Sequence, residues 1–294
     1  MIYYFLPDPG IFGGVKVACE FLEMIISCGA KALAVFPGGI APQWFPVSVP
    51  VMAEHDALKL INRSDRVMIT WPPDYHRLKG LPGKLICHCQ GTDDLMDPIF
   101  ADRTVPVLTC WKQAADYVMG KFNRSTIHVG ISIPDCFYYD GTVKLDNRVA
   151  YMPRRGFPLV RRCMRQCDGI DFDPLDGLTE LRVSRRLKQA GLFMATSVGE
   201  QFGLPSLEAM AAGCLVVSVP VKGGMEYLCH GENCLVTEPD SIGETLNWIT
   251  SRDNETLRIR LRSRAIATAF LYRRVLQKRL LKNLLATSLK ELIQ

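Results

Sequence analysis

The sequence predicts an α/β protein made of two domains, each built on its own parallel sheet. The chain has 294 residues, which is enough for two domains of about 150 residues each. Short apolar segments alternate with helical stretches along the whole chain, as is typical of parallel strands joined by crossover helices. Hydrophobic residues make up 48% of the chain and charged residues 22%, so that a substantial core can form.

In the first half, short apolar segments predict strands and longer periodic segments predict helices. We expect strands at residues 2–6, 31–36, 66–71, 84–88, 105–109 and 127–131, and helices at residues 15–28 and 114–119. The segment 37–50 is rich in proline, which predicts a surface loop.

A polar segment, residues 138–148, separates the two halves and contains the turn-forming pairs Asp140-Gly141 and Asp146-Asn147. We place the boundary there, which makes residues 1–146 the first domain and residues 147–294 the second. In the second domain we expect strands at residues 149–152, 169–172, 192–196, 214–219 and 233–236. The helices are expected at residues 161–167, 178–190, 209–212, 241–251 and 254–292.

The most informative segment is residues 197–218, in which Glu200 and Glu208 are separated by seven residues. The turn-forming sequence Phe202-Gly203-Leu204-Pro205 lies between the two glutamates, and the helix that starts there ends at Gly213, before an apolar strand. The N–H groups at such a helix start favour a phosphate. A carboxylate beside them can accept hydrogen bonds from sugar hydroxyls. The alternative is an ordinary helix start, with acidic residues placed by the helix dipole.

This motif, with EAMAAGCLVVS and GGMEYL after it, resembles the E-x7-E signature of retaining glycosyltransferases of the glycosyl transferases group 1 family. The resemblance implies the GT-B fold, in which two Rossmann-like domains face a cleft. In that family the second domain binds a nucleoside-diphosphate sugar, and the first domain binds the acceptor. The terminal helix of the family commonly packs back on the first domain.

The resemblance also implies roles for single residues. Glu200 would be the catalytic residue that faces the donor sugar, and Glu208 would bind the ribose. The backbone amides of Phe202, Gly203 and Leu204 would approach the sugar and the diphosphate. Glu226, in GGMEYL, would organise the donor loop; its alternative is an acid at a helix start.

Arg154 and Arg155 follow the expected strand at residues 149–152, at the edge of a parallel sheet where ligands bind. The family places a basic pair in this region to hold the donor diphosphate, and guanidinium groups suit phosphate oxygens. Arg161 and Arg162 follow closely, so the residue that performs this role stays open. The alternative is a solvated charged face.

The first domain offers weaker candidates. Gly13 and Gly14 precede the first long helix, where the family lets the backbone approach a phosphate or the acceptor; ordinary loop chemistry is the alternative. Many relatives carry a histidine near the donor sugar, for which His88 and Gln90 are both candidates. If the imidazole of His88 lies within its strand, it is a core histidine instead.

No metal or cofactor is expected. The eleven cysteines include Cys87 and Cys89 around His88, and Cys163 with Cys167, but no paired zinc-type spacing, and reduced thiols in a cytoplasm explain them better. The segment Asp171-Phe172-Asp173 matches a metal–nucleotide DxD pattern of another glycosyltransferase class. We interpret it as a nucleobase-side loop or a simple turn, because GT-B members usually work without metal.

The sequence predicts a cytoplasmic protein. No apolar run reaches the roughly 18 residues of a membrane span, and the N-terminal segment lacks the basic start of a signal peptide. The last helix is basic and amphipathic, so it packs on the protein or touches the inner face of a membrane. A nucleic-acid partner is disfavoured, since the basic residues concentrate in this one helix.

The sequence therefore predicts a retaining, metal-independent glycosyltransferase that transfers a sugar from a nucleoside-diphosphate sugar to a glycan, lipid or other hydroxyl acceptor. Two alternatives remain: a sugar-nucleotide epimerase or hydrolase of the same fold, and a non-catalytic glycosyltransferase-like binding protein. The motifs do not fix the nucleobase, the sugar, the acceptor or the oligomeric state.

Overall fold

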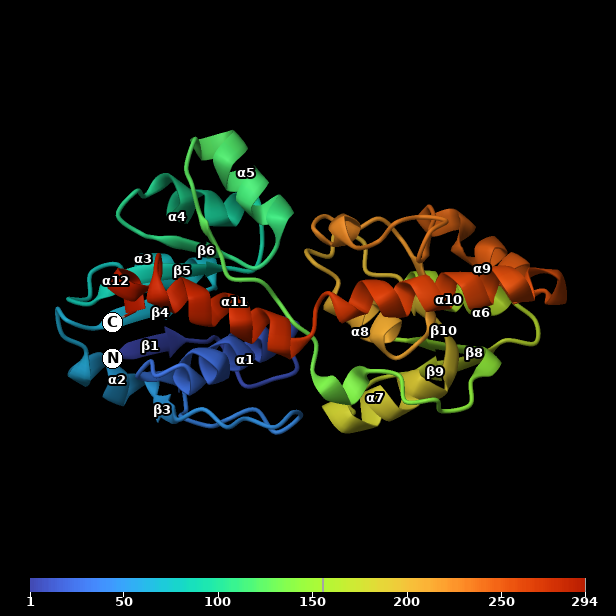
Figure 1. Cartoon of the computed structure of the whole chain (residues 1–294), viewed down its shortest axis with the longest axis horizontal. Coiled ribbons are helices and arrows are strands. Elements are labelled where there is room, and N and C mark those ends of the chain that lie inside the picture. The colour runs from blue at the N-terminus through green and yellow to red at the C-terminus, as the bar shows by residue number, and fades with distance from the viewer. Residues whose placement is uncertain (155, 294) are drawn as a thin grey trace. The chain divides into compact units, whose positions relative to one another are not determined.

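The computed structural model describes residues 1–154 and 156–293 and divides them into two compact units (Figure 1). The first unit is formed by Met1–Ser132 together with the C-terminal segment from Val275 onward, and the second unit by Ile133–Arg274. Each unit is a parallel sheet covered by helices, so the predicted mixed α/β fold with two Rossmann-like sheets is confirmed.

Among the described residues, the sheet of the first unit has seven strands in the order β3-β2-β1-β4-β5-β6-β7. All neighbouring pairs are parallel. The strands are β1 (Ile2–Phe5), β2 (Ala32–Phe36), β3 (Val51–Ala53), β4 (Arg66–Ile69), β5 (Lys84–Cys89), β6 (Val107–Thr109) and β7 (Ile127–His128).

The helices of the first unit are α1 (Gly13–Ser27), α2 (Glu54–Leu60), α3 (Pro72–Leu78), α4 (Asp97–Ala101), α5 (Lys112–Phe122), most of α11 (Arg274–Ala286), and α12 (Lys290–Ile293). Strand β3 and helices α2, α3 and α4 are absent from the sequence prediction, because none is longer than seven residues and none has room for a clear hydrophobic period. The predicted loop at residues 37–50 contains no helix or strand.

The sheet of the second unit has five described parallel strands in the order β12-β11-β10-β8-β9. They are β8 (Leu145–Tyr151), β9 (Asp171–Pro174), β10 (Ala190–Ala195), β11 (Leu215–Ser218) and β12 (Leu235–Val236). The helices around this sheet are α6 (Phe157–Gln166), α7 (Glu180–Gln189), α8 (Leu204–Ala211), α9 (Ile242–Thr250) and α10 (Glu255–Phe270).

The predicted single helix over residues 254–292 is wrong, because the chain leaves the helical conformation between α10 and α11. There the carbonyl of Tyr272 accepts a hydrogen bond of 2.8 Å from the N–H of Ile133, and Arg273 forms a parallel bridge with Ile133. The amphipathic pattern hides this break because it continues on both sides of it.

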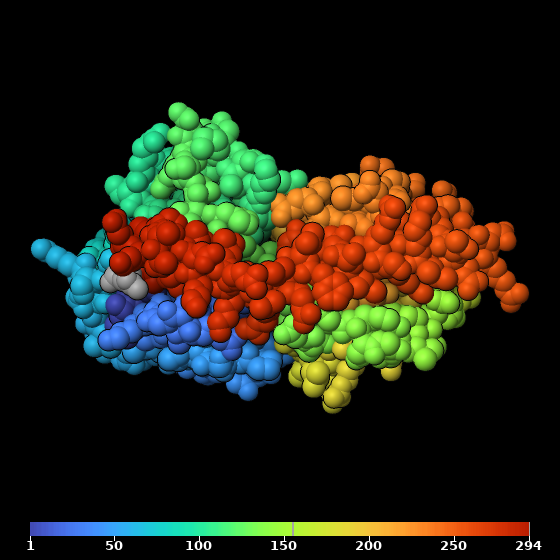
Figure 2. Space-filling view, viewed as in Figure 1, coloured from blue at the N-terminus to red at the C-terminus, as the bar shows by residue number. Residues whose placement is uncertain are grey.

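After the break, the chain packs on the first unit, and the space-filling view shows the described residues of this segment, in red, on the surface of that unit (Figure 2). The side chains of Leu281, Leu285, Leu289 and Ile293 belong to the apolar core that contains β1 and α1. Lys282 and Lys290, which lie between these residues, face solvent, as solvated charges on a packed helix do.

The contacts also move the division between the units relative to the expected boundary after residue 146. Residues 133–144 pack on the second unit, where the hydroxyl of Tyr138 donates to the carbonyl of Ala269 at 2.9 Å. The N–H of Tyr139 donates to the carbonyl of Ala211, also at 2.9 Å. These long-range contacts leave no trace in local composition, which indicates only where the chain is polar.

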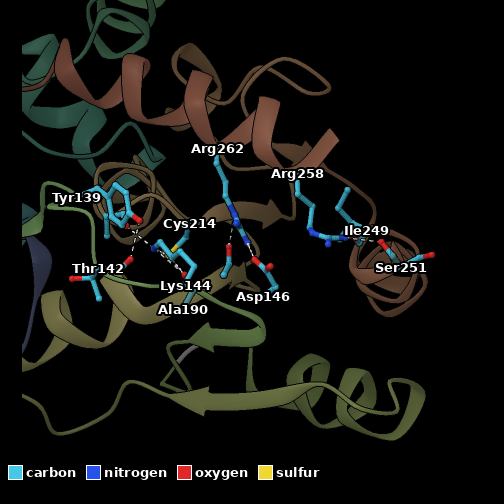
Figure 3. Close-up of polar contacts among 12 residues, drawn as sticks. Tyr139, Thr142, Lys144, Asp146, Ala190, Cys214, Ile249, Ser251, Arg258 and Arg262 are labelled. Atoms are coloured by element: carbon cyan, nitrogen blue, oxygen red, sulfur yellow. Dashed lines mark hydrogen bonds and ion pairs between the residues drawn. The ribbon is translucent and has the colours of Figure 1, made fainter. Parts of the chain in front are cut away.

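Lys144 lies inside this second unit and caps two helices at once (Figure 3). Its ammonium donates to the carbonyls of Leu187 at 3.0 Å, Ala190 at 2.9 Å and Ala212 at 2.6 Å, which are the last carbonyls of α7 and α8. A cation at the C-terminal end of a helix complements the helix dipole. Burial lowers the pKa of Lys144, since desolvation disfavours the charged form.

Two arginines of α10 also form hydrogen bonds or ion pairs within the second unit (Figure 3). Arg258 donates to the carbonyls of Ile249 and Ser251 at 2.7 and 2.6 Å, just where α9 ends. Arg262 forms an ion pair with Asp146 at 2.6 Å. Part of the basic character of this helix is therefore structural.

The substitution Lys144→Met should lower the free energy of unfolding of the second unit by about 2 to 3 kcal/mol, because it leaves several buried carbonyls without their charged donor. Chemical denaturation followed by circular dichroism measures the loss. The control is Lys188→Met, which removes a lysine that forms an ion pair with the half-exposed Asp140 at 2.8 Å. An ion pair with a solvent-exposed partner contributes little to stability, so equal losses in the two variants would contradict the capping role.

Candidate functional site

The predicted donor residues of the second unit follow two neighbouring strands at one edge of its sheet. Arg154 follows β8, and the loop that contains Glu200 follows β10, which pairs in parallel with β8. The two loops adjoin, because a Cβ placed on Gly156 would clash with the backbone carbonyl oxygen of Thr196. The structure thus brings Arg154 and the acidic motif to the carboxyl edge of the same sheet, as the sequence predicts.

The motif itself forms the loop and the start of α8. Gly203 is the N-cap, with a φ of 77° in the left-handed region that favours glycine. Phe202 and Leu204 are buried on either side of it. Glu208 lies in the second turn of α8 and is only 5% exposed, although it carries a carboxylate. A carboxylate buried this deeply is uncommon.

The other end of α8 is closed by the glycine that the sequence predicts. Helix α8 ends in a Schellman motif, in which Gly213 N–H donates to the carbonyl of Met210 at 3.0 Å and Cys214 N–H to that of Ala209 at 2.9 Å. The helix is therefore fixed at its end by Gly213 and by Lys144, and its start lies at the sheet edge with the motif.

The backbone of the motif is held by a second segment, residues 222–227. The N–H of Lys222 donates to the carbonyl of Glu200 at 2.9 Å, and that of Gly223 to the carbonyl of Gln201. Gly224 lies so close to the motif that a Cβ there would clash with the carbonyl oxygen of Phe202. The second glycine of GGMEYL is therefore required for close approach of two chain segments.

Glu226 lies at the end of this segment, in a short 3-10 helix, Gly224–Glu226. One of its carboxylate oxygens accepts a hydrogen bond of 3.5 Å from the hydroxyl of Tyr272. Burial, and then the charge of Glu226, raise the pKa of Tyr272. The role of Glu226 in organising the donor loop stays a prediction.

The four arginines considered for the diphosphate differ in their surroundings. Arg162 forms an ion pair with Asp240 at 2.7 Å and donates to the carbonyl of Pro239, so it stabilises the turn before α9. Arg154 lies 3.7 Å from Asp176 and is about half exposed. Arg161 is exposed on α6. Arg155 lies outside the described residues.

His88 lies in the core of the first unit and is 0% exposed. Its Nδ1 lies 2.8 Å from the hydroxyl of Tyr4, its Nε2 lies 3.1 Å from Sγ of Cys110, and the ring packs on Phe21 at 4.5 Å. Burial lowers the pKa of His88 to about 3. Both ring nitrogens therefore have partners inside the core. Of the two alternatives that the sequence left open, this position matches a core histidine rather than a catalytic group.

Gln90, by contrast, meets the start of α1. A Cβ placed on Gly14 would lie 2.7 Å from Oε1 of Gln90, while a Cβ on Gly13 would meet nothing within 4 Å. The amide nitrogen of Gln90 donates to the hydroxyl of Tyr4 at 3.3 Å. Gln90, Gly13 and Gly14 therefore gather at one point of the first unit. Sequence reasoning missed Tyr4, which reads as an ordinary strand residue but links Gln90 to His88.

Both aspartates of the segment Asp171-Phe172-Asp173 form ion pairs. Asp171 forms an ion pair with Arg148 at 2.7 Å, and Asp173 forms one with Arg186. Within residues 1–154 and 156–293, no group of three or more His, Cys, Asp or Glu side chains has the arrangement of a metal site, and every cysteine is a free thiol.

No helix in the described part of the chain combines the length and the apolar character that a membrane crossing needs.

A comparison with protein families matches residues 177–267 to the family described as "Glycosyl transferases group 1". This segment runs from before α7 into α10 and contains the whole acidic motif and GGMEYL. A comparison with curated proteins gives no match.

Solved structures share the fold over nearly the whole chain. HepE from Anabaena, in complex with UDP-glucose, has a TM-score of 0.76 at 13% identity, with 97% of this chain and 99% of HepE covered. A sucrose-phosphate synthase from Thermosynechococcus elongatus has a TM-score of 0.76 at 10% identity, with 99% of each chain covered. A glycosyltransferase from Rickettsia africae has a TM-score of 0.65 at 13% identity, with 96% of each chain covered.

These identities are low, so the similarity concerns the fold. The chain therefore has the two-sheet fold of the GT-B glycosyltransferases, and its segment 177–267 matches the glycosyl transferases group 1 family.

Proposed function

We propose that this protein is a retaining glycosyltransferase that uses a nucleoside-diphosphate sugar. The observation that carries the proposal is the motif's geometry. A buried carboxylate, Glu208, lies one turn into a helix whose N-cap, Gly203, is fixed at the carboxyl edge of a parallel sheet. The family match over the same residues supports this reading. Fold similarity to HepE, whose structure contains UDP-glucose, favours a UDP-sugar as the donor.

In the proposed mechanism, Glu208 accepts hydrogen bonds from the ribose hydroxyls, and Glu200 orients the donor sugar. The amides of Phe202, Gly203 and Leu204 approach the sugar and the diphosphate. As the glycosidic bond breaks, the diphosphate gains negative charge, which these amides and the Arg154 guanidinium stabilise. No metal takes part. We propose front-face transfer, in which the leaving phosphate assists the attacking hydroxyl and the anomeric configuration is kept.

The acceptor hydroxyl belongs to a glycan or a lipid in this proposal, and the first unit binds it near Gly13, Gly14 and Gln90. Peripheral membrane contact through the basic C-terminal residues stays a prediction of the sequence. So does a cytoplasmic location.

A screen of UDP-, GDP-, ADP- and TDP-sugars by thermal shift tests the proposal. A ligand that binds only the folded state raises the melting temperature, and at 100 times its Kd it adds about 2.7 kcal/mol of stability. We expect a UDP-sugar to give the largest shift, and NMR of the product to show a retained anomeric configuration. Binding without turnover for any acceptor would indicate a binding protein. A changed sugar released without acceptor would indicate an epimerase, and a free sugar a hydrolase.

A further inference from the structure

The hydroxyl of Tyr227 is buried beneath the motif, on the side of the backbone carbonyls. Tyr227 is 1% exposed, and its hydroxyl lies 2.6 Å from the carbonyl oxygen of Gly203 and 3.2 Å from that of Phe202. Its ring packs on Phe202 at 5.2 Å and on Tyr272 at 6.1 Å. The phenol therefore has a fixed position: besides these two main-chain acceptors, its hydroxyl has a side-chain hydrogen bond with Ser206 at the start of α8.

The carbonyls of Phe202 and Gly203 continue a series. The preceding two carbonyls, those of Glu200 and Gln201, accept hydrogen bonds from the N–H groups of Lys222 and Gly223. Four consecutive carbonyls of the motif thus face one support, formed by the backbone at residues 222–223 and the side chain of Tyr227. The support changes from backbone to side chain where the motif turns into α8.

The direction of these carbonyls fixes the direction of the N–H groups. In a trans peptide the C=O of one residue and the N–H of the next lie in one plane and point in opposite directions. The N–H groups of Gly203 and Leu204 therefore point away from the Tyr227 hydroxyl. They are two of the amides that would approach the sugar and the diphosphate under the proposed function.

We infer that Tyr227 is a positioning residue for the donor site, which holds the two peptides after Phe202 and Gly203 so that their N–H groups face the diphosphate-sugar. This inference rests on the proposed function, because it assigns the N–H groups a ligand. Tyr227 does not touch the ligand; it acts through the motif's backbone. Gly224 assists, since only a residue without a side chain lets the carbonyl of Phe202 approach this closely.

The test compares Tyr227→Phe with a matched variant, Tyr138→Phe. Tyr138 is also buried in the second unit, and its hydroxyl also donates to a main-chain carbonyl, that of Ala269 at 2.9 Å. Both variants lose a buried hydroxyl that donates to the main chain, so both should lose stability. Only Tyr227 supports the motif, so only its variant should change binding.

Calorimetry with UDP-glucose, UDP and uridine separates the positions along the donor. For Tyr227→Phe we expect about three- to tenfold weaker binding of UDP-glucose and UDP, and binding of uridine within about twofold of the wild type. Uridine carries the ribose, which Glu208 would bind, but neither phosphate nor sugar. Tyr138→Phe should leave all three affinities unchanged.

Other outcomes overturn the inference or its basis separately. Equal affinities in the wild type and Tyr227→Phe, or an equal loss for uridine, would overturn the positioning role while the proposed function stands. A wild type that binds none of these three ligands, and no GDP-, ADP- or TDP-sugar in the thermal-shift screen, would overturn the proposed function itself. If Tyr227→Phe does not fold, Gly224→Ala replaces it, because its Cβ pushes on the same carbonyl; we expect the same selective loss, and its absence overturns the inference.

Discussion

Replacement of Glu208 by alanine should weaken UDP-glucose binding by about 100- to 1000-fold, the loss expected when two hydrogen bonds to a charged group are removed from a ribose. Glu208 is 5% exposed and lies in α8, so the change should remove hydrogen-bonding capacity without exposing new core. The variant Glu208→Gln keeps the shape and one acceptor, and we expect a loss of about tenfold. Isothermal titration calorimetry measures all three affinities.

The matched control is Glu244→Ala. Glu244 is an exposed glutamate in the first turn of α9, in the same unit. Its variant should bind UDP-glucose like the wild type, and circular dichroism should show native folding for both alanine variants. Unchanged affinity in a folded Glu208→Ala protein would remove the central support for the donor site.

Acid should destabilise the first unit through His88. Its pKa is lowered to about 3 by burial, against 6.5 for the ordinary imidazole of the unfolded chain. Below pH 6.5 the unfolded state therefore binds a proton that the folded state does not, so stability falls as pH falls, until the folded group also titrates near pH 3. The slope is about 1.4 kcal/mol per pH unit, or about 2 kcal/mol between pH 6.5 and pH 5.

Urea denaturation across this pH range measures the effect. The variant His88→Gln lacks the titrating group, so its stability should fall less steeply with acid. The difference between the two slopes of stability against pH should correspond to one bound proton. NMR of the imidazole nitrogens provides a second measurement that needs no variant. The His88 ring should stay neutral at pH 5 in the folded protein. A His88 signal that titrates near pH 6.5 would contradict the burial and the hydrogen bonds to Tyr4 and Cys110.

The sequence predicted the parts of this fold that have a local cause. Apolar runs predicted most strands, and Pro205 and Gly213 marked the two ends of α8, because a helix start tolerates proline and a helix end favours glycine. The acidic motif could be recognised from the sequence because its two glutamates, its turn and its helix lie within one contiguous segment. Arg154 could be placed at the carboxyl end of its own strand, where ligands of parallel sheets bind.

The features that the sequence did not predict depend on residues far apart in the chain. The break after α10 depends on a hydrogen bond between Tyr272 and Ile133. The side chain of Arg162 is held by its ion pair with Asp240. Tyr227 follows Glu226 in GGMEYL, but its contact with the acidic motif forms only in the folded chain. The partners of His88 come from β1 and from the residue after β6, so no local pattern could decide between its two interpretations.

The pairing of Ile133 with Tyr272 and Arg273 brings the first and last residues of the second unit side by side. That unit is thus an uninterrupted stretch of polypeptide whose ends already meet, inserted into a first unit assembled from two separate pieces. Evolution and protein engineering can exchange such a domain at one place in the structure, where its two ends meet. The first unit, by contrast, needs both of its chain segments for a complete core.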